Sequence, residues 1–82
     1  MTEPIRILLF ARYAELLGAE RIELGAAAPL SVRDLLDKVR ALPGGSALPE
    51  SPLCAVNLRQ ARASDIVSPG DEVALLPPLA GG

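Results

Sequence analysis

The sequence of 82 residues contains no histidine and a single cysteine, Cys54. Histidine is the commonest general base and the commonest metal ligand among side chains, and one cysteine cannot form an internal disulfide. We therefore expect neither a metal centre nor a Ser-His or Cys-His nucleophile system within this chain. If the protein takes part in covalent chemistry, a partner has to supply most of the reactive groups.

Aromatic residues and excess charge are scarce as well. Aromatic residues make up 2% of the sequence, so Leu, Val, Ile and Ala have to fill the core of what can only be one domain at this length. Lys and Arg number 8 against 10 Asp and Glu, so the net charge is −2. Such a charge lacks the basic surplus that nucleic-acid binding requires, and we expect no nucleic-acid partner.

The sequence also lacks targeting and membrane-spanning patterns. Its first residues, Met1–Pro4, have neither the basic start nor the apolar run of a signal peptide. The longest apolar run, Val73–Ala80, contains two prolines and falls far short of the ~20 residues that cross a membrane as a helix. These features predict a soluble, cytoplasmic protein with no membrane partner.

The beginning of the chain predicts a strand, a helix and a second strand. Residues 5–10 are apolar and β-branched and too few for a buried helix, so they indicate an interior strand. From Phe10 to Leu17 apolar residues recur at helical spacing, and Gly18 stands where a helix commonly ends. Residues 21–24 alternate between polar and apolar, which is typical of a half-exposed strand.

The clearest helical pattern covers residues 31–42. Ser31 and Asp34 form a capping signature at its start, which satisfies backbone N–H groups of the first turn. One apolar stripe follows at helical spacing: Val32, Leu35, Leu36, Val39 and Leu42. Residues 43–52 are rich in Pro, Gly and Ser, so we expect a surface loop there.

The last third of the chain predicts three further strands. Residues 54–57 indicate a strand, 57–60 a turn and 61–63 a weak return strand. A Pro-Gly turn at 68–71 then leads into a strand at 72–76. The element order describes one α+β domain over residues 1–76, and Pro77 and Pro78 end its sheet. Residues 77–82 are therefore expected to leave the body as a flexible tail.

The terminal pair Gly81-Gly82 suits a tail that enters the active site of another protein. A carboxylate resists attack until one of its oxygens becomes a leaving group, such as an adenylate, and this activation requires access. Glycines present the slimmest backbone possible, whereas side chains at these positions would crowd a narrow channel. A frayed, functionless chain end is the alternative interpretation of the same residues.

Three segments together carry a family resemblance: Ile5–Phe10 followed by Ala11–Gly18, the triplet Ala55–Asn57, and the terminal run Pro69–Gly82. The terminal Pro-Pro-x-x-Gly-Gly and the preceding Gly-Asp-Glu-Val are the most specific parts. The sequence resembles the small, sulfur-carrying subunits of molybdopterin synthase. The resemblance implies a ubiquitin-like β-grasp fold, in which a mixed β-sheet packs against helices and an extended C-terminal Gly-Gly tail follows.

The same resemblance implies a function as a non-catalytic carrier. An ATP-dependent activating enzyme would adenylate the carboxylate of Gly82, which would then become a thiocarboxylate, or 1-thioglycine. The large synthase subunit would receive the tail and deliver the sulfur to cyclic pyranopterin monophosphate, building the dithiolene of molybdopterin. The inserted tail residues would be Pro77, Pro78, Leu79, Ala80 and Gly81. The resemblance implies no bound cofactor and no metal in the carrier, with ATP used by the activating enzyme.

Family members dock on the large subunit through apolar residues that correspond to Phe10 and Leu76. The family often has an aromatic residue where Leu76 stands. Because each of the two residues ends an apolar strand, packing in the core is the default interpretation for both. Cys54 lies at the start of an apolar strand, where a free cysteine behaves as a small hydrophobic residue.

Two other functions use the same terminal chemistry. The protein could carry sulfur for another product, such as the thiazole of thiamine, a thiolated tRNA base or cysteine. It could also be a protein modifier, in which Gly82 is joined to lysines of target proteins. A plain interaction domain is a third alternative, and it would tolerate truncation of the terminus.

Overall fold

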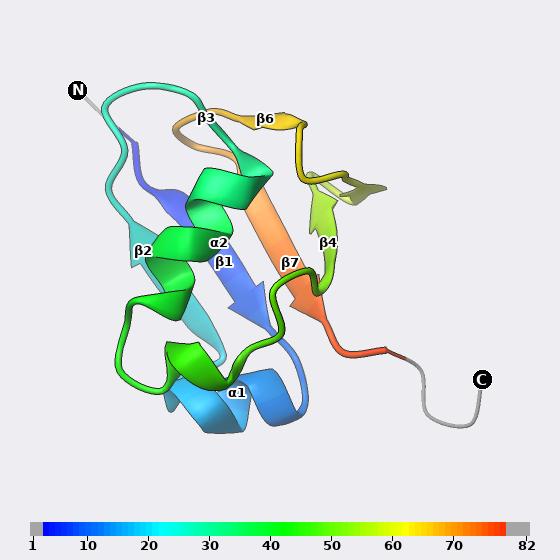
Figure 1. Cartoon of the computed structure of the whole chain (residues 1–82). Helices are drawn as coiled ribbons and strands as arrows, with labels where there is room; N and C mark the ends of the chain where they lie inside the picture. Colours follow the sequence, from blue (N-terminus) through cyan, green and yellow to red (C-terminus); the bar gives the residue numbers. More distant parts are fainter. Residues whose placement is uncertain (1–2, 79–82) are drawn as a thin grey trace.

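The computed structural model describes residues 3–78 of the chain, which form a sheet with helices packed on one side (Figure 1). In chain order the elements are β1 (Ile5–Leu9), α1 (Arg12–Leu17), β2 (Arg21–Leu24), β3 (Leu30–Ser31), α2 (Val32–Arg40), the 3₁₀ turn η1 (Gly45–Ala47), β4 (Leu53–Val56), β5 (Arg59–Gln60), β6 (Ile66–Val67) and β7 (Glu72–Leu76). The predicted order of the longer elements is confirmed.

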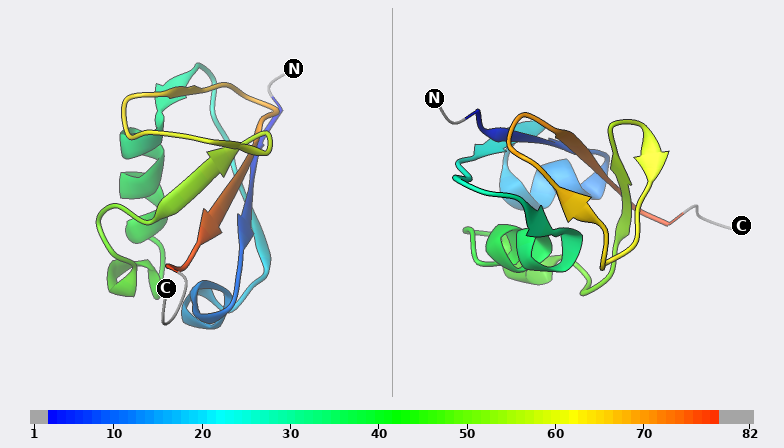
Figure 2. Two further views of the ribbon diagram at one scale, coloured as in Figure 1. Left: turned by 90° about the vertical axis from the view of Figure 1, so that its right-hand side faces the viewer. Right: turned by 90° about the horizontal axis from the view of Figure 1, so that it is seen from above.

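The main sheet has five strands in the order β2-β1-β7-β4-β5. β1 and β7 pair in parallel, and the other neighbours pair antiparallel, so the sheet is mixed. β1 lies between β2 and β7, as expected of an apolar interior strand. The short strands β3 and β6 form a separate two-stranded sheet. Figure 2 shows that α2 lies across one face of the main sheet and leaves the other face uncovered by any described helix.

The core lies between the main sheet and α2. Because side chains alternate between the two faces of a strand, every second residue of β1 and β7 points to the helix. The buried residues of these three elements are Ile5, Ile7 and Leu9, Val73 and Leu75, and Val32, Leu35, Leu36 and Val39. Tyr13 of α1 and Leu48 beyond η1 close the end of the core next to α1.

The predicted capping of α2 is confirmed. The backbone N–H of Asp34 donates a hydrogen bond of 3.1 Å to the side-chain oxygen of Ser31, which adopts an extended backbone conformation. Lys38 and Arg40 lie in the last turn, where positive charge is favourable. The helix ends at Arg40, so Leu42 lies beyond it, contrary to the prediction that extended the helix to residue 42.

Three further predictions of local structure are wrong. The turn after β4 is the pair Asn57-Leu58, and the return strand is Arg59–Gln60 instead of 61–63. Asn57 and Leu58 have φ values of 50° and 70°, as a two-residue hairpin of this type requires, but leucine is a rare residue there. The segment 43–52 is not only surface, because Leu48 is buried with 2% exposure. The two-residue strands β3 and β6 are too short for any periodicity to reveal.

Candidate functional site

The uncovered face of the main sheet carries a row of apolar side chains, which we call the outer-face cluster: Leu8, Phe10, Leu53, Ala55, Ala74 and Leu76. The strand registers bring these residues together. Ala74 is the pairing partner of Leu8 on one side and of Ala55 on the other, and Leu53 is opposite Leu76. Leu9 and Leu75 are a parallel pair, and Phe10 and Leu76 follow them by one position. Leu76 is the last residue of β7, whereas β1 ends at Leu9, so Phe10 lies just beyond the strand that was predicted to include it.

The most exposed members of the cluster gather at the end of the sheet where β7 stops. Phe10 is 43% exposed, Leu53 45% and Leu76 36%. The default interpretation that Phe10 and Leu76 pack in the core is therefore wrong for both residues. Leu53 was missed, because the predicted strand began at Cys54. The alternation of Cys54 and Val56 toward the core would have placed Leu53 on the opposite face.

An unusual turn between β1 and α1 positions Phe10. The backbone N–H of Tyr13 donates to the carbonyl oxygen of Phe10 at 3.1 Å, and Ala11 between them has φ 52° and ψ −126°. This conformation belongs to the second residue of a type II′ turn, where glycine is the usual residue. The helix therefore starts two residues after Phe10, and Phe10 remains on the outer face instead of beginning a helix as predicted.

The predicted tail begins beside α1. β7 ends at Leu76, Pro77 is half-buried, and Pro78 is exposed. Pro78 lines a groove of about 340 Å³ together with residues of α1 and of the segment around η1: Arg12, Tyr13, Leu16, Ala47 and Pro49. The structure thus places the start of the tail next to the exposed end of the outer-face cluster. The predicted site residues Leu79, Ala80, Gly81 and Gly82 lie outside the described residues.

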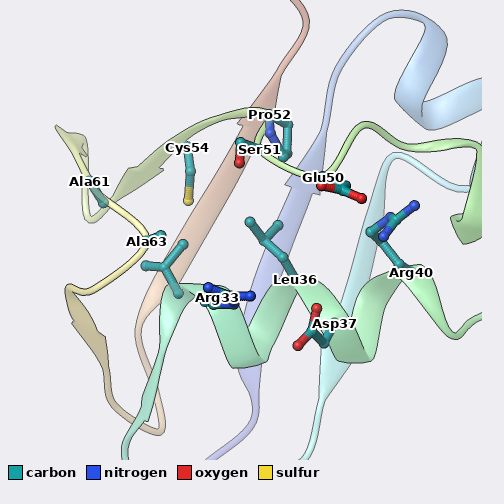
Figure 3. Close-up of a pocket in the computed structure, with 11 residues that line it drawn as sticks. Arg33, Leu36, Asp37, Arg40, Glu50, Ser51, Pro52, Cys54, Ala61 and Ala63 are labelled. Atoms are coloured by element: carbon teal, nitrogen blue, oxygen red, sulfur yellow. The ribbon is translucent and has the colours of Figure 1, made fainter.

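A second cavity, of about 330 Å³, lies on the other side of the sheet between α2 and β4 (Figure 3). Arg33, Asp37 and Arg40 of α2 face Glu50 and Ser51 across it, and Leu36 and Cys54 form part of its wall. Arg40 donates a hydrogen bond of 3.1 Å to the carbonyl oxygen of Leu48, so it ties α2 to the following loop. The cavity is lined by charges of both signs, and the Arg40 hydrogen bond connects the two segments that border it. Both features favour a structural role for the cavity.

Cys54 is a buried thiol, as the sequence predicted for a small hydrophobic residue. Its side chain is 4% exposed and forms no disulfide. Burial, and to a smaller extent the negative charge of Asp65, raises the pKa of Cys54 to about 11. A thiol with such a pKa is protonated at neutral pH and is a poor nucleophile.

Asp71 serves the turn that precedes β7. Its carboxylate accepts a hydrogen bond of 2.8 Å from the backbone N–H of Ser68. Glu72 follows as the first residue of β7, and its backbone N–H donates to the side-chain oxygen of Asn57 at 3.0 Å. The Asp71 carboxylate and the Glu72 backbone N–H thus both stabilise the local structure at the start of β7.

Residues 3–78 contain no group of three His, Cys, Asp or Glu side chains that could hold a metal ion. None of the helices found there is both long and apolar enough to cross a membrane. The outer-face cluster and the adjacent start of the tail form the candidate functional site of the described chain, because Phe10, Leu53 and Leu76 expose apolar side chains where the tail begins.

The chain matches the family model described as the ThiS family over residues 7–82. It belongs to the ThiS family. No curated protein matches the sequence. The matched range includes the outer-face cluster and the whole of the predicted tail. The family assignment therefore rests on nearly the full sequence and agrees with the resemblance that its motifs indicated.

Solved structures show the same fold. SAMP1 from Haloferax volcanii is 28% identical, with a TM-score of 0.80, over 96% of this chain and 99% of that chain. A candidate molybdopterin converting factor subunit 1 from Pyrococcus furiosus is 23% identical, with a TM-score of 0.80, over 95% of this chain and 100% of that chain. A complex of subunits 1 and 2 of molybdopterin-converting factor from Helicobacter pylori matches at 19% identity and a TM-score of 0.68, over 96% of this chain and 99% of that chain.

These similarities confirm the ubiquitin-like β-grasp fold that the motifs implied. Together with the family assignment, they identify the chain as a ubiquitin-like protein of the sulfur-carrier or modifier type. Small carriers of this type are generally non-catalytic subunits.

Proposed function

We propose that this protein is the sulfur-carrying small subunit of a molybdopterin synthase. In this role it is not itself catalytic, and its tail, residues 77–82, enters the active site of a large subunit. The carboxylate of Gly82 is first adenylated by an activating enzyme that consumes ATP, and a sulfur donor then displaces AMP to leave a thiocarboxylate. The large subunit uses this sulfur to build the dithiolene from cyclic pyranopterin monophosphate.

The observation that carries the proposal is the position of the outer-face cluster. Phe10, Leu53 and Leu76 expose apolar side chains at the end of the sheet from which the tail departs. Contiguous exposed apolar residues on a small monomer mark an interaction surface. A partner that covers these residues would hold the start of the tail in place. The next residues of the chain would then reach no more than about 20 Å into its active site.

Charge supports the same scheme. The carrier is acidic, with a net charge of −2, and a terminal thiocarboxylate keeps the end of the tail negatively charged, as the carboxylate was. Basic residues at the entrance of a partner would attract such a tail and increase the association rate more than the final affinity. The nucleophilic sulfur is supplied by the modified terminus, so the carrier itself requires no titratable catalytic side chain.

The protein-modifier alternative is favoured by one specific observation. A crystal structure of small archaeal modifier protein 1 from Haloferax volcanii matches this chain at 27% identity with a TM-score of 0.77. A modifier and a sulfur carrier use the same activated Gly82 and differ in the final acceptor, which is a lysine amine in one case and a sulfur-accepting substrate in the other. Sulfur carriage for thiamine, tRNA or cysteine differs only in that substrate.

The intact mass of the protein purified from its own cells tests the terminal chemistry. A thiocarboxylate adds the mass difference between sulfur and oxygen, whereas a modifier appears in a ladder of larger conjugates. The chemically prepared thiocarboxylate is then mixed with the large synthase subunit of the same organism and cyclic pyranopterin monophosphate. Formation of the dithiolene supports the proposal, and its absence with a large subunit that is active with another carrier refutes it.

Docking through the outer-face cluster is tested separately. Phe10→Ala and Leu76→Ala are expected to weaken binding to the large subunit by about tenfold or more, as truncated apolar anchors do. Leu58→Ala is the matched control, because Leu58 is 90% exposed at the tip of the β4–β5 hairpin, away from the start of the tail. Equal affinities for all three variants and the parent would exclude the cluster as the docking surface.

A further inference from the structure

The strand β2 forms an edge of the main sheet and pairs only with β1 among the described strands. In their ladder the N–H of Leu9 donates to the carbonyl oxygen of Glu20 at 2.8 Å, and Ile7 is opposite Ile22 in the same register. Hydrogen-bonded and non-hydrogen-bonded pairs alternate along an antiparallel ladder. Ile22 therefore directs its backbone groups toward β1, whereas Arg21 and Glu23 direct theirs away from the sheet.

The side chains of this edge alternate in the same way. Arg21 and Glu23 are exposed, and Ile22 and Leu24 are half-buried and pack against the core. The two residues whose backbone groups are free at the edge therefore also carry exposed charges of opposite sign. Charged side chains on an edge strand commonly prevent pairing with another chain. When the two charges on an edge strand are of opposite sign and two residues apart, they prevent pairing with a second copy only in the registers that place like charges opposite each other.

We propose that β2 is a self-complementary edge through which two copies of this protein associate by antiparallel β2–β2 pairing. When the two strands are centred on Ile22, Arg21 of each copy lies opposite Glu23 of the other. Both of these pairs are of the hydrogen-bonded type, so each exchanges two backbone N–H···O bonds. The register that satisfies the free backbone groups is thus the one that brings opposite charges together.

Other occupants and registers fit the edge less well. Shifting the two strands by two residues in either direction keeps the hydrogen-bonding parity but places Arg21 opposite Arg21, or Glu23 opposite Glu23. Like charges directly opposite each other are destabilising. In the centred register the half-buried Ile22 of each copy meets its equivalent at the two-fold axis, on the side of the sheet that carries α2. The apolar core is then continued from one copy to the other.

The expected association is weak and leaves the outer-face cluster free. β2 contributes four residues, so the interface is far smaller than that of a stable complex, and dimers are expected only at high protein concentration. Pairing at an edge extends the sheet sideways and covers neither of its faces. Phe10 and Leu76 therefore remain accessible in the dimer. Formation of this dimer does not depend on sulfur transfer.

Sedimentation equilibrium of the full chain over a range of concentrations tests the pairing. We expect the parent to form a dimer at high concentration. Arg21→Glu and Glu23→Arg should each weaken this dimer by about tenfold or more, because each puts like charges opposite each other. An equimolar mixture of the two single variants should associate again, since every opposing pair is then of opposite charge. The double variant, with both substitutions in one chain, should dimerise as the parent does.

Arg59→Glu is the matched control, because it makes the same change in net charge as Arg21→Glu but lies on β5, at the other edge of the sheet. It should leave the dimer unchanged. All substituted residues are exposed, and circular dichroism will verify that each variant is folded. A parent that stays monomeric at every concentration would overturn the proposal. The same holds if the single variants dimerise as tightly as the parent, or if mixing them restores nothing. None of these measurements involves sulfur transfer, so they are independent of the proposed function.

Discussion

Truncation of leucines on the buried face of α2 should destabilise the domain by amounts that depend on their surroundings. Leu36→Ala is the informative change, because Leu36 is 5% exposed and forms part of the wall of the cavity between α2 and β4. Leu35 is 1% exposed and is not among the residues that line this cavity. The two substitutions remove the same atoms from neighbouring positions of one helix.

The magnitudes follow from what surrounds each side chain. Leu-to-Ala substitutions in cores cost about 2–5 kcal/mol, and the cost rises with the volume of the empty cavity that remains. At Leu36 the vacated space joins a cavity that is already open to water, so we expect about 2–3 kcal/mol. At Leu35 the vacated space is closed on all sides, so we expect about 4–5 kcal/mol. The free energy of unfolding of an 82-residue protein is about 4–12 kcal/mol in total, so both losses of stability are easily measured.

Urea denaturation followed by far-ultraviolet circular dichroism measures both free energies of unfolding, and equal slopes against urea show that the unfolding transition is unchanged. Leu58→Ala serves as the control. Leu58 is 90% exposed, so its truncation should change stability by less than about 0.5 kcal/mol. If Leu36→Ala had the same free energy of unfolding as the parent, the assignment of the buried face of α2 would be refuted. If Leu36→Ala lowered the free energy of unfolding more than Leu35→Ala, the assignment of an open cavity beside Leu36 would be refuted.

Three further predictions concern single residues. Because burial raises the pKa of Cys54 to about 11 while the unfolded thiol titrates near its ordinary value, stability should fall by about 2–3 kcal/mol as the pH rises from ~8.5 to ~11. Cys54→Ala should remove this slope, and an unchanged slope would contradict the assignment. Ala11→Gly should stabilise the fold by about 1 kcal/mol, because glycine adopts the conformation of this turn without strain. Ala14→Gly, inside α1, should destabilise the fold by a similar amount. If the urea midpoints of both variants shifted in the same direction, strain at Ala11 would be excluded. Gly81→Val leaves the carboxylate of Gly82 in place but adds a bulky side chain to the tail. Single-turnover sulfur transfer should therefore slow, while the affinity for the large subunit and the melting temperature stay the same. Sulfur transfer at the parent rate would refute the steric role of the double glycine.

Elements specified by neighbouring residues could be predicted from the sequence. The start of α2 was predicted because its cap joins Ser31 to the N–H of Asp34, three residues away, and its buried face follows from helical spacing. The strands at residues 5–9 and 72–76 were evident from their composition. The terminal motif indicated the family from its residue order alone. In each case the decisive interactions or residues lie close together in the sequence.

Local rules failed where the backbone adopts an unusual conformation. Helical spacing from Phe10 to Leu17 suggested that the helix begins at Phe10, but the turn at Ala11 delays it until Arg12. Ala11 has a conformation that glycine usually adopts, and Leu58 has a positive φ that leucine rarely adopts. Composition gives no warning of such positions.

The exposure of the candidate site was decided by the tertiary structure alone. Phe10 and Leu76 each end an apolar strand, and their sequence contexts predicted burial. Alternation shows that neighbouring residues of a strand point to opposite faces, but not which face the helices will cover. That choice depends on α2, which packs on the side of Ile7 and Val73 and leaves Phe10, Leu53 and Leu76 in solvent. Likewise, the free edge of β2 exists only because the sheet order places β1 on one side of it and no described strand on the other.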